Sequence, residues 1–218
     1  MKSQNTTFIR NVFYNYVMVS LYTSGDTLEK VADEVIHCPL CKLSQSRRNA
    51  VPGDGRISAK IMFIGEAPGR YEDEKGKPFV GAAGRILNEA LEKAGIERSL
   101  VFITNVVKCR PPGNRIPEED ERSACRSYLE RQISIIAPKI ICVLGSTAYS
   151  SILGGKSITA DRGRTVERDG QKYFLTVHPA SAIYNKSLQL VLYEDVRKLS
   201  KELKKIEIEN TKTLLDSA

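Results

Sequence analysis

Apolar residues are distributed along this chain in two alternating patterns. Four short runs rich in β-branched residues each end in a polar or Gly- and Pro-rich loop, which is typical of buried strands. Between and around these runs, apolar residues recur every three or four positions, as they do on one face of a helix. The predicted strands are residues 60–64, 100–107, 139–144 and 172–177, and the predicted helices are residues 27–37, 83–94, 117–136, 146–153 and 188–206.

The alternation of strands and helices predicts an α/β fold with helices on both faces of a parallel sheet. Open sheets of this kind bind ligands outside the carboxyl ends of their strands. Each predicted strand is followed by a loop of unusual composition, so we expect four loops to form a pocket at one edge of the sheet. These loops contain residues 65–69, 104–114, 145–147 and 178–181.

The two ends of the chain differ from the part between them. Residues 1–25 are rich in Asn, Thr, Tyr and Ser, and we expect a flexible extension there, although a short ordered helix would also fit. Residues 26–208 are expected to form one domain, and the charged residues 209–218 a frayed tail. The sequence shows no clear secretory signal and no apolar run long enough to span a membrane, so a cytoplasmic protein is expected.

The composition adds a preference for a polyanionic partner. The chain has 218 residues, a formal net charge of +7 and a pI of about 9.1, and 41% of its residues are hydrophobic. The length and the hydrophobic fraction suit one domain with a substantial core. The positive charge is compatible with binding to DNA or RNA, although many basic proteins do not bind nucleic acid.

Five cysteines in a chain of this kind favour metal or redox chemistry over structural disulfides. Cys38 and Cys41 form a C-x2-C pair, Cys109 follows a predicted strand, and Cys125 lies on the helix after it. Four thiolates fit either an iron–sulfur cluster or an all-thiolate zinc site, and the spacing does not distinguish the two; four unrelated thiols are the remaining alternative. Cys142 lies inside an apolar strand and is interpreted as a small buried hydrophobic residue.

Four sequence blocks carry a resemblance to a known family. They read GEAPG at residues 65–69, GKPFVG at 76–81, TNVVKCRPP at 104–112 and HPA at 178–180. In this order, at the ends of the predicted strands, they resemble the family 4 uracil-DNA glycosylases over roughly residues 27–205. The resemblance implies a three-layer αβα sandwich with a central four-stranded, mainly parallel sheet. It also implies a structural 4Fe-4S cluster bound by Cys38, Cys41, Cys109 and Cys125.

The resemblance further implies hydrolysis of the bond between uracil and deoxyribose in DNA, with the base flipped into a pocket. Phe79 would stack on the uracil, and Asn105 would read its N3–H and O4 and reject cytosine. His178 would donate a hydrogen bond to uracil O2, where negative charge develops as the bond breaks. An ordinary core position for Phe79 and a local backbone partner for Asn105 are the alternatives. The residues expected to line the pocket through their backbone are Gly65, Glu66 and Ala67.

The residue that activates water is the least defined part of this site. Family 1 enzymes of the same superfamily carry an aspartate where this sequence has Ala67. Among the acidic residues that follow, Glu72 is predicted to have a catalytic role, either orienting water or excluding the methyl group of thymine. A solvated acidic loop is the alternative. Without such a carboxylate, the mechanism would rest mainly on stabilising the leaving group.

The loops around the pocket are also the expected DNA-binding surface. Backbone, hydroxyl and basic groups there can bind phosphates, and an apolar or aromatic side chain can enter the base stack. Tyr184 is the predicted wedge, with Ile183 as the second choice. The other predicted DNA-binding residues are Pro112, Ser146, Ser181 and Arg110, and the further basic candidates are Lys108, Arg115 and Arg164.

Two other classes of function remain open at this point. A non-catalytic nucleic-acid-binding module would keep the fold and the cysteines, and an electron-transfer protein would use the cysteines with a second cofactor. Phe79, Asn105 and His178 favour an enzyme over the first class, and the sequence has no G-x-G-x-x-G segment after a strand to support the second. We expect a monomer that acts on single- or double-stranded DNA containing uracil.

Overall fold

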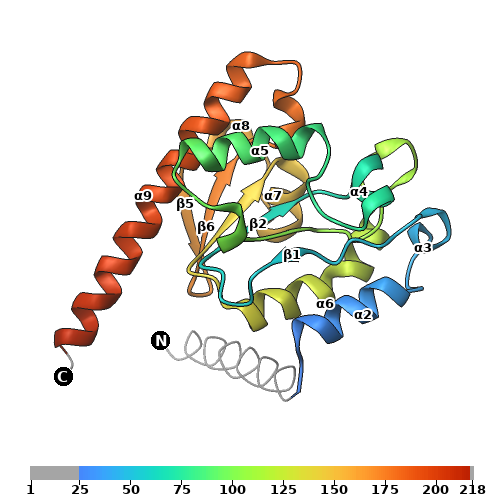
Figure 1. The fold of residues 1–218 in the computed structure, drawn as a ribbon, viewed down its shortest axis with the longest axis horizontal. Helices are drawn as coiled ribbons and strands as arrows, with labels where there is room; N and C mark the ends of the chain where they lie inside the picture. Colours follow the sequence, from blue (N-terminus) through green and yellow to red (C-terminus); the bar gives the residue numbers. More distant parts are fainter. Residues whose placement is uncertain (1–24, 217–218) are drawn as a thin grey trace, which may run out of the picture.

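A six-stranded mixed sheet runs through the centre of the molecule (Figure 1). Its strands are β1 (Asp54–Gly55), β2 (Ile61–Gly65), β3 (Phe102–Asn105), β4 (Ile140–Leu144), β5 (Thr165–Arg168) and β6 (Gln171–Thr176). They lie in the order β1-β3-β2-β4-β6-β5; the four inner strands pair in parallel and the two edge strands pair antiparallel. The computed structural model describes residues 25–216, so the predicted extension at residues 1–25 lies outside the described part except for its last residue.

The sheet confirms the expected α/β class but has six strands instead of four. β1 has only two residues, both exposed, so no apolar pattern marks it. β5 lies at the other edge, where only its first residue is partly buried. A turn signal for β5 is nevertheless present in the sequence. Asp169 and Gly170, between β5 and β6, both have positive φ, the backbone that Asp-Gly supplies in two-residue hairpins.

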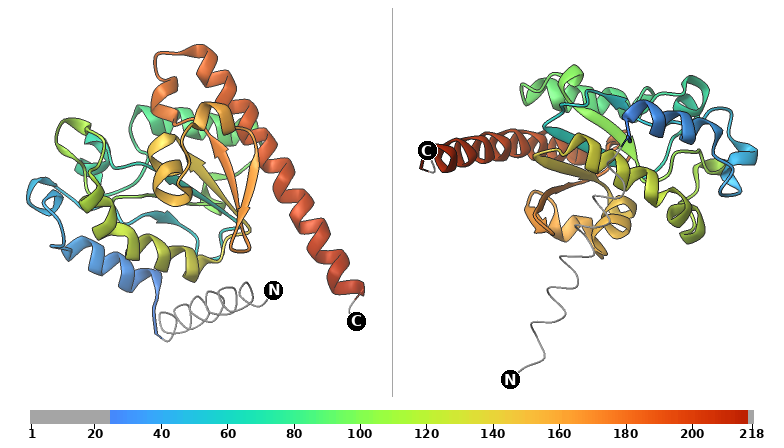
Figure 2. Two further views of the ribbon diagram at one scale, coloured as in Figure 1. Left: turned by 180° about the vertical axis from the view of Figure 1, so that it is seen from behind. Right: turned by 90° about the horizontal axis from the view of Figure 1, so that it is seen from below.

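Helices cover both faces of this sheet (Figure 2). They are α2 (Leu28–His37), α5 (Ala82–Lys93), α6 (Glu119–Ile136), α7 (Ser146–Leu153), α8 (Ile158–Asp161) and α9 (Lys186–Asp216). On one face, α5 and α9 share a cluster with Ile61 and Phe63 of β2; on the other, α2, α6, α7 and α8 share a cluster with Met62 and Ile64. Successive strand residues point to opposite faces, which explains the unbroken apolar run in β2.

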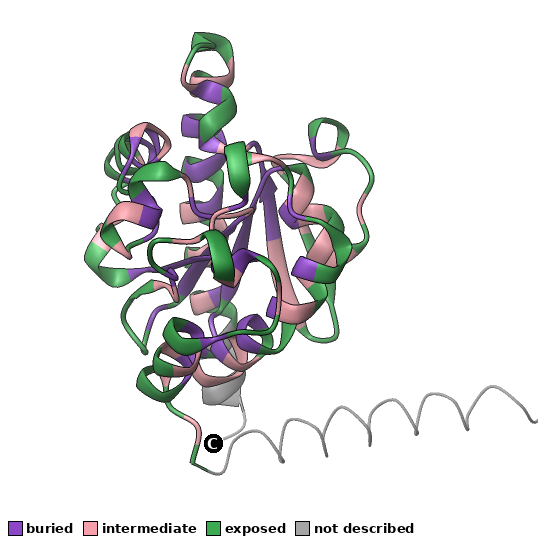
Figure 3. Ribbon diagram, turned by 90° about the vertical axis from the view of Figure 1, so that its right-hand side faces the viewer, coloured by how far each residue is buried: buried purple, intermediate pink, exposed green. Residues whose placement is uncertain are grey.

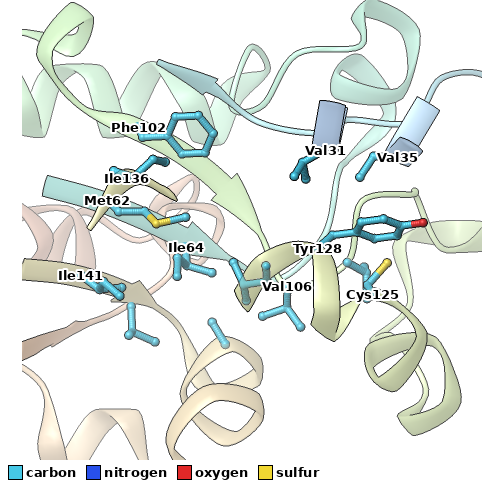
Figure 4. Packing of buried hydrophobic residues seen from close by; sticks show 14 of the residues in the cluster. Val31, Val35, Met62, Ile64, Phe102, Val106, Cys125, Tyr128, Ile136 and Ile141 are labelled. Carbon is cyan, nitrogen blue, oxygen red and sulfur yellow. The ribbon is translucent and has the colours of Figure 1, made fainter. Parts of the chain in front are cut away.

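The core beneath α2 and α6 includes three of the cysteines that the sequence analysis singled out. Figure 4 shows Val31 and Val35 of α2 facing Tyr128 and Cys125 of α6, and all four residues are buried. Figure 3 shows burial across the whole described structure, with buried residues concentrated in the strands and on the inner faces of the helices. The apolar periodicity of the helices therefore reports their contact with the sheet.

Helix ends follow local sequence signals where these are strong. The helix expected to begin near Pro117 begins at Glu119, because Glu118 is its N-cap and the Glu121 carboxylate accepts a hydrogen bond from the Glu118 backbone N–H at 2.7 Å. The last helix, expected to end at residue 206, continues to Asp216 through most of the predicted frayed tail, beyond the edge of the sheet (Figure 1). Within residues 25–216, no helix has the length and apolar character needed to cross a membrane.

Short elements lie in the loops that connect the strands and the longer helices. Three of them follow inner strands, in the loops where the sequence predicted a pocket: α4 (Arg70–Lys75) after β2, and the 3-10 turns η2 (Pro112–Asn114) after β3 and η3 (Pro179–Ala182) after β6. The other two are α3 (Leu43–Ser46), which precedes β1, and the 3-10 turn η1 (Arg98–Leu100), which precedes β3.

Candidate active site

A cavity of about 720 Å³ opens at the carboxyl ends of β2, β3, β4 and β6. The loops after all four inner strands contribute to its wall, as the strand order predicts, because parallel strands end on the same side of a sheet. Gly65 lies directly behind the wall, while Arg110, Pro112 and Tyr184 lie outside it. The predicted site residues in the wall are Glu66, Ala67, Glu72, Phe79, Asn105, Ser146, His178 and Ser181.

Asn105, the last residue of β3, presents an unpaired acceptor to the cavity. Its side chain is 1% exposed, and within the described residues its Oδ1 has no hydrogen-bond partner. Gly65 at the end of β2 leaves the space in front of it open: a Cβ there would lie 2.5 Å from Asn105 Oδ1 and 2.8 Å from Phe79 Cζ. A buried polar atom without a partner is costly, so it marks a place where a ligand can bind.

His178 presents an unpaired donor to the same cavity. Its Nδ1 accepts a hydrogen bond from the Ala180 backbone N–H at 3.1 Å, so the neutral ring carries its proton on Nε2. Although the residue is only half-buried at the rim, Nε2 is buried and has no partner among the described residues. Burial lowers the pKa of His178 to about 4, because desolvation disfavours the imidazolium. Gly145, whose Cβ would lie 2.8 Å from His178 Cβ, allows this close packing.

Phe79 forms the third side of the site. Its ring lies 5.7 Å from the His178 ring, centroid to centroid, and the residue is 6% exposed. Its φ of 51° lies in the left-handed region, which is rare for a residue with a large side chain. Gly84 of α5 makes room for this backbone, because a Cβ there would lie 1.9 Å from the Phe79 carbonyl oxygen. Strained residues of this kind concentrate at binding sites.

Glu72 lines the cavity, but its carboxylate is already engaged by backbone amides. Oε1 accepts hydrogen bonds from Val80 N at 2.9 Å and Gly81 N at 2.8 Å, and Oε2 accepts one from Gly69 N at 3.1 Å. The neighbouring Asp73 is equally engaged, with Arg48 N at 2.9 Å. These contacts do not describe a solvated acidic loop, and the catalytic role of Glu72 stays a prediction.

Some of the predicted DNA-binding residues are freely exposed, and others already donate hydrogen bonds within the protein. Tyr184 is 99% exposed beyond η3, and Ser146 and Ser181 are exposed in the wall of the cavity. Arg110 is partly buried and donates to Asn114 Oδ1 at 2.7 Å, beside the exposed Pro112. Arg164 is exposed and donates to the Ala160 carbonyl at 3.2 Å, and Ile183 lies in the wall.

Two basic candidates are already paired inside the protein. Arg115 makes a two-pronged contact with the buried Glu121 carboxylate, at 2.8 and 2.6 Å. Lys108 is 1% exposed, and its Nζ donates to Thr104 Oγ1, Asn105 O and Gln132 Oε1 at 2.7–2.8 Å. Burial lowers the pKa of Lys108 to about 7. Phosphate binding by Lys108 is therefore wrong as a prediction, because the sequence shows its charge and not its burial.

The four cysteines with metal-ligand spacing lie in or against one hydrophobic cluster of the core, away from the cavity wall. Cys38, Cys109 and Cys125 are buried in one cluster, and Cys41 packs against it. Burial raises the pKa of Cys109 and raises that of Cys125 to about 11, and Cys38 and Cys41 are close enough to Cys109 to contribute. Arg47 Nη1 lies 3.1 Å from Cys109 Sγ.

The fifth cysteine is separate from these four. Cys142 is fully buried in the cluster on the opposite face of the sheet, which fits its interpretation as a small hydrophobic residue. Across the described residues, no three or more His, Cys, Asp or Glu side chains are arranged to hold a metal ion. The structure therefore places four thiols in or against one part of the core, and the metal cluster expected there remains a prediction.

Comparison with known proteins assigns the chain to a family. The family model described as the uracil DNA glycosylase superfamily matches residues 52–205, which include the whole cavity wall. This chain belongs to the uracil-DNA glycosylase superfamily. The type-4 uracil-DNA glycosylase of Sulfurisphaera tokodaii is 54% identical over 184 residues, covering 80% of this chain and 84% of the relative. That of Saccharolobus solfataricus is 52% identical over 188 residues, covering 82% and 87%.

The likeness extends to more distant organisms. The type-4 uracil-DNA glycosylase of Thermotoga maritima is 43% identical over 190 residues, covering 85% of this chain and 99% of the relative. The chain is therefore a member of the type-4 group, as the sequence blocks around Phe79, Asn105 and His178 predicted. Two residues that support the site lie outside the four sequence blocks and were not predicted. Arg98 of η1 donates a hydrogen bond to the backbone before Phe79. Gly84 leaves room for the Phe79 backbone, and a glycine inside a helical pattern is the kind of sequence signal that can indicate such close packing.

Proposed function

We propose that this chain removes uracil from DNA by hydrolysing the N-glycosidic bond of a flipped-out deoxyuridine. One observation carries the proposal: an unpaired buried acceptor, Asn105 Oδ1, and an unpaired buried donor, His178 Nε2, face one cavity beside the Phe79 ring. Uracil offers the complementary groups, a donor at N3 and acceptors at O2 and O4. The names of the type-4 relatives agree with this chemistry.

Recognition of uracil would depend on the amide of Asn105. Oδ1 would accept from N3–H, and the amide NH2 would donate to O4. Cytosine presents an acceptor at N3 and a donor at C4, so it would leave both groups of the buried amide unpaired. A site built in this way rejects the wrong base strongly, because each unpaired buried group costs free energy. Phe79 would add a stacking surface for the flipped base.

Bond cleavage would depend on His178. As the bond between C1′ and N1 breaks, negative charge accumulates on uracil O2 and positive charge on the sugar. A neutral imidazole that already points Nε2–H into the cavity stabilises this leaving group without a proton transfer. The wall has Ala67 where family 1 enzymes carry a carboxylate, and the Glu72 oxygens accept backbone hydrogen bonds. We therefore assign most of the rate to leaving-group stabilisation.

DNA binding would use the exposed rim of the cavity. The hydroxyl groups of Ser146 and Ser181 and the loop of Pro112 can contact phosphates, and the side chain of Arg110 can neutralise one. Tyr184 projects into solvent with almost its whole surface, as a side chain that enters the base stack must do before binding. The monomeric state and the cytoplasmic location expected from the sequence remain predictions.

We also propose that Cys38, Cys41, Cys109 and Cys125 bind a 4Fe-4S cluster. The donor set supports this, because four thiols from two loops and a helix lie in or against one hydrophobic cluster of the core, with a guanidinium at 3.1 Å from one sulfur. Thiolates are the usual ligands of such clusters, and nearby cations and hydrogen-bond donors stabilise their negative charge. The cluster would supply a structural link between the C-x2-C loop, the loop after β3 and α6.

The glycosylase proposal is tested with oligonucleotides that contain uracil or thymine at one position, treated with alkali after incubation to cut abasic sites. We expect cleavage only at uracil, and no cleavage there would overturn the proposal. His178→Ala should slow excision by about 100- to 1,000-fold, the usual effect of losing one donor to a developing oxyanion, with little change in DNA affinity. His37→Ala is the matched control, because His37 is the other histidine and is exposed outside the cavity.

The cluster proposal is tested by metal content and colour. Natively purified protein should be brown and contain iron and sulfide, and Cys109→Ser should lose both. Cys142→Ala, which changes the cysteine in the hydrophobic cluster on the opposite face of the sheet, should keep them. Zinc in place of iron in the native protein would contradict the assignment.

A further inference from the structure

The segment that carries Phe79 is held in place by hydrogen bonds with Arg98, which lies outside the cavity wall, and with Glu72, which lies in it. We call residues 78–81, between α4 and α5, the Phe79 loop. Phe79 has a φ of 51°, in the left-handed region that residues with a side chain seldom adopt. A residue with a side chain keeps such a backbone only where surrounding contacts enforce it. The contacts that do so can therefore be identified from the structure.

One set of contacts comes from Arg98 in η1. Its Nη2 donates to the Pro78 carbonyl at 3.0 Å, and its Nη1 donates to Asn88 Oδ1 of α5 at 2.8 Å. The guanidinium thus connects the residue before Phe79 to the helix after it. Arg98 is partly buried and lies outside the cavity wall, so it acts on the site only through the loop.

A second set of contacts reaches the loop from the other side. Glu72 Oε1 accepts from the backbone N–H groups of Val80 and Gly81, the two residues after Phe79. The Phe79 carbonyl packs against α5, where Gly84 leaves room for it. The Phe79 loop is therefore bound before Phe79 by the Arg98 guanidinium and after Phe79 by the Glu72 carboxylate. At Phe79 itself, the backbone packs directly against α5 at Gly84, which has no side chain.

We propose that Arg98, together with Glu72, is a positioning residue that fixes the strained Phe79 backbone so that the ring stacks on the bound uracil. The proposal rests on uracil excision as the activity. Loss of either contact allows the Phe79 loop to relax to an ordinary backbone, which moves the ring away from the base. Contacts with phosphates are made by other loops, so they stay intact. The selective consequence is weaker binding of the base with unchanged binding of the DNA backbone.

The test compares two ligands on Arg98→Ala: free uracil as an inhibitor, and DNA that contains a stable abasic-site analogue. We expect uracil inhibition to weaken by about tenfold, which corresponds to the loss of one hydrogen bond from a charged donor. Affinity for abasic DNA should change by less than about twofold, since no base is present to stack. Arg98→Lys, which can still donate to the Pro78 carbonyl, should recover part of the loss.

Two further variants separate positioning from folding. Asn88→Ala removes only the acceptor that orients the guanidinium, so it should weaken uracil inhibition in the same direction and to a smaller extent. Arg85→Ala, at an exposed arginine of the same helix outside the cavity, is the matched control and should change neither ligand. Thermal melting of each variant shows whether a change in ligand binding exceeds any change in stability.

The role of Glu72 has its own comparison. Glu72→Gln keeps an Oε1 acceptor for both amides, so it should retain far more activity than Glu72→Ala if the residue acts by positioning. Equal losses in the two variants would mean that the carboxylate charge itself is needed, which overturns the positioning role. If the wild-type protein fails to excise uracil, the proposed function fails. If the wild type excises uracil but Arg98→Ala behaves like Arg85→Ala, only the inference about Arg98 fails.

Discussion

His178 is expected to remain neutral at neutral and mildly acidic pH. Its Nδ1 accepts from the Ala180 backbone N–H, so protonating Nδ1 would break a hydrogen bond that the loop supplies. Burial adds a second cost, because the imidazolium would lose its hydration, and it lowers the pKa from 6.5 to about 4. The perturbation that tests this arrangement is a change of pH.

The magnitude follows from the shift. At about 1.4 kcal/mol per pKa unit, a change from 6.5 to about 4 favours the neutral ring by about 3 kcal/mol. At pH 6, about one ring in a hundred would then be charged. Below the unfolded pKa of 6.5, the unfolded chain takes up a proton that the folded chain refuses. The contribution of His178 to stability is therefore complete above that pH and is lost as the pH falls toward about 4.

The assay is nitrogen-15 NMR of the histidine rings, which is simple because the chain has only two histidines. His178→Asn identifies the His178 signals by their disappearance. We expect the Nε2–H tautomer and no titration of the His178 ring between about pH 5.5 and 8. In the pH profile of single-turnover excision, we expect no ionisation near pH 6.5 that is present in the wild type and absent from His178→Asn. A midpoint between about 6 and 7, or a proton on Nδ1, would refute the reasoning.

Two other substitutions test how the site is built. Gly65→Ala should reduce excision by about a hundredfold, or about 3 kcal/mol, because the new Cβ would meet Asn105 Oδ1 at 2.5 Å where uracil must bind. Gly95→Ala, which also strains a positive φ but lies outside the cavity, should lower the melting temperature and leave excision unchanged. Normal excision by Gly65→Ala together with reduced excision by Gly95→Ala would contradict the proposed base pocket. Lys108→Met should lower the free energy of unfolding by about 3 kcal/mol in chemical denaturation, because three buried acceptors lose their donor. The same change at the exposed Lys139 should cost almost nothing, and equal effects would show that the hydrogen bonds of Lys108 are unimportant.

The positions of the inner strands and most helices could be predicted because their apolar periodicity is local. Ile61–Gly65 and Ile140–Leu144 lie within one residue of their predicted starts, since residues buried on both faces of a sheet must be continuously apolar. The edge strands escaped the same reasoning, because a strand with one neighbour and exposed residues has no such constraint. The long continuation of α9 escaped it too, since the helix leaves the sheet that imposes the pattern.

The residues at the base pocket were also predictable, for a different reason. Asn105 lies near the end of one predicted strand and His178 follows another, and parallel strands bring their carboxyl ends to one edge, so topology alone places them together. The sequence blocks around them then indicated which chemistry to expect. The unpaired state of Asn105 Oδ1 and His178 Nε2 could not be predicted, because it depends on what every neighbouring loop leaves vacant or fills.

The sequence by itself determined the kind of fold, the family and the chemical groups available at the pocket. The tertiary structure decided what the charged residues around it do. Lys108 has the sequence context of a phosphate contact and is instead buried beneath Asn105, while Glu72 binds the amides beside Phe79. Arg98 reaches Pro78 from twenty residues away. A hydrogen bond between distant segments depends on where the packed elements bring two atoms together, and no local pattern of residues encodes that distance.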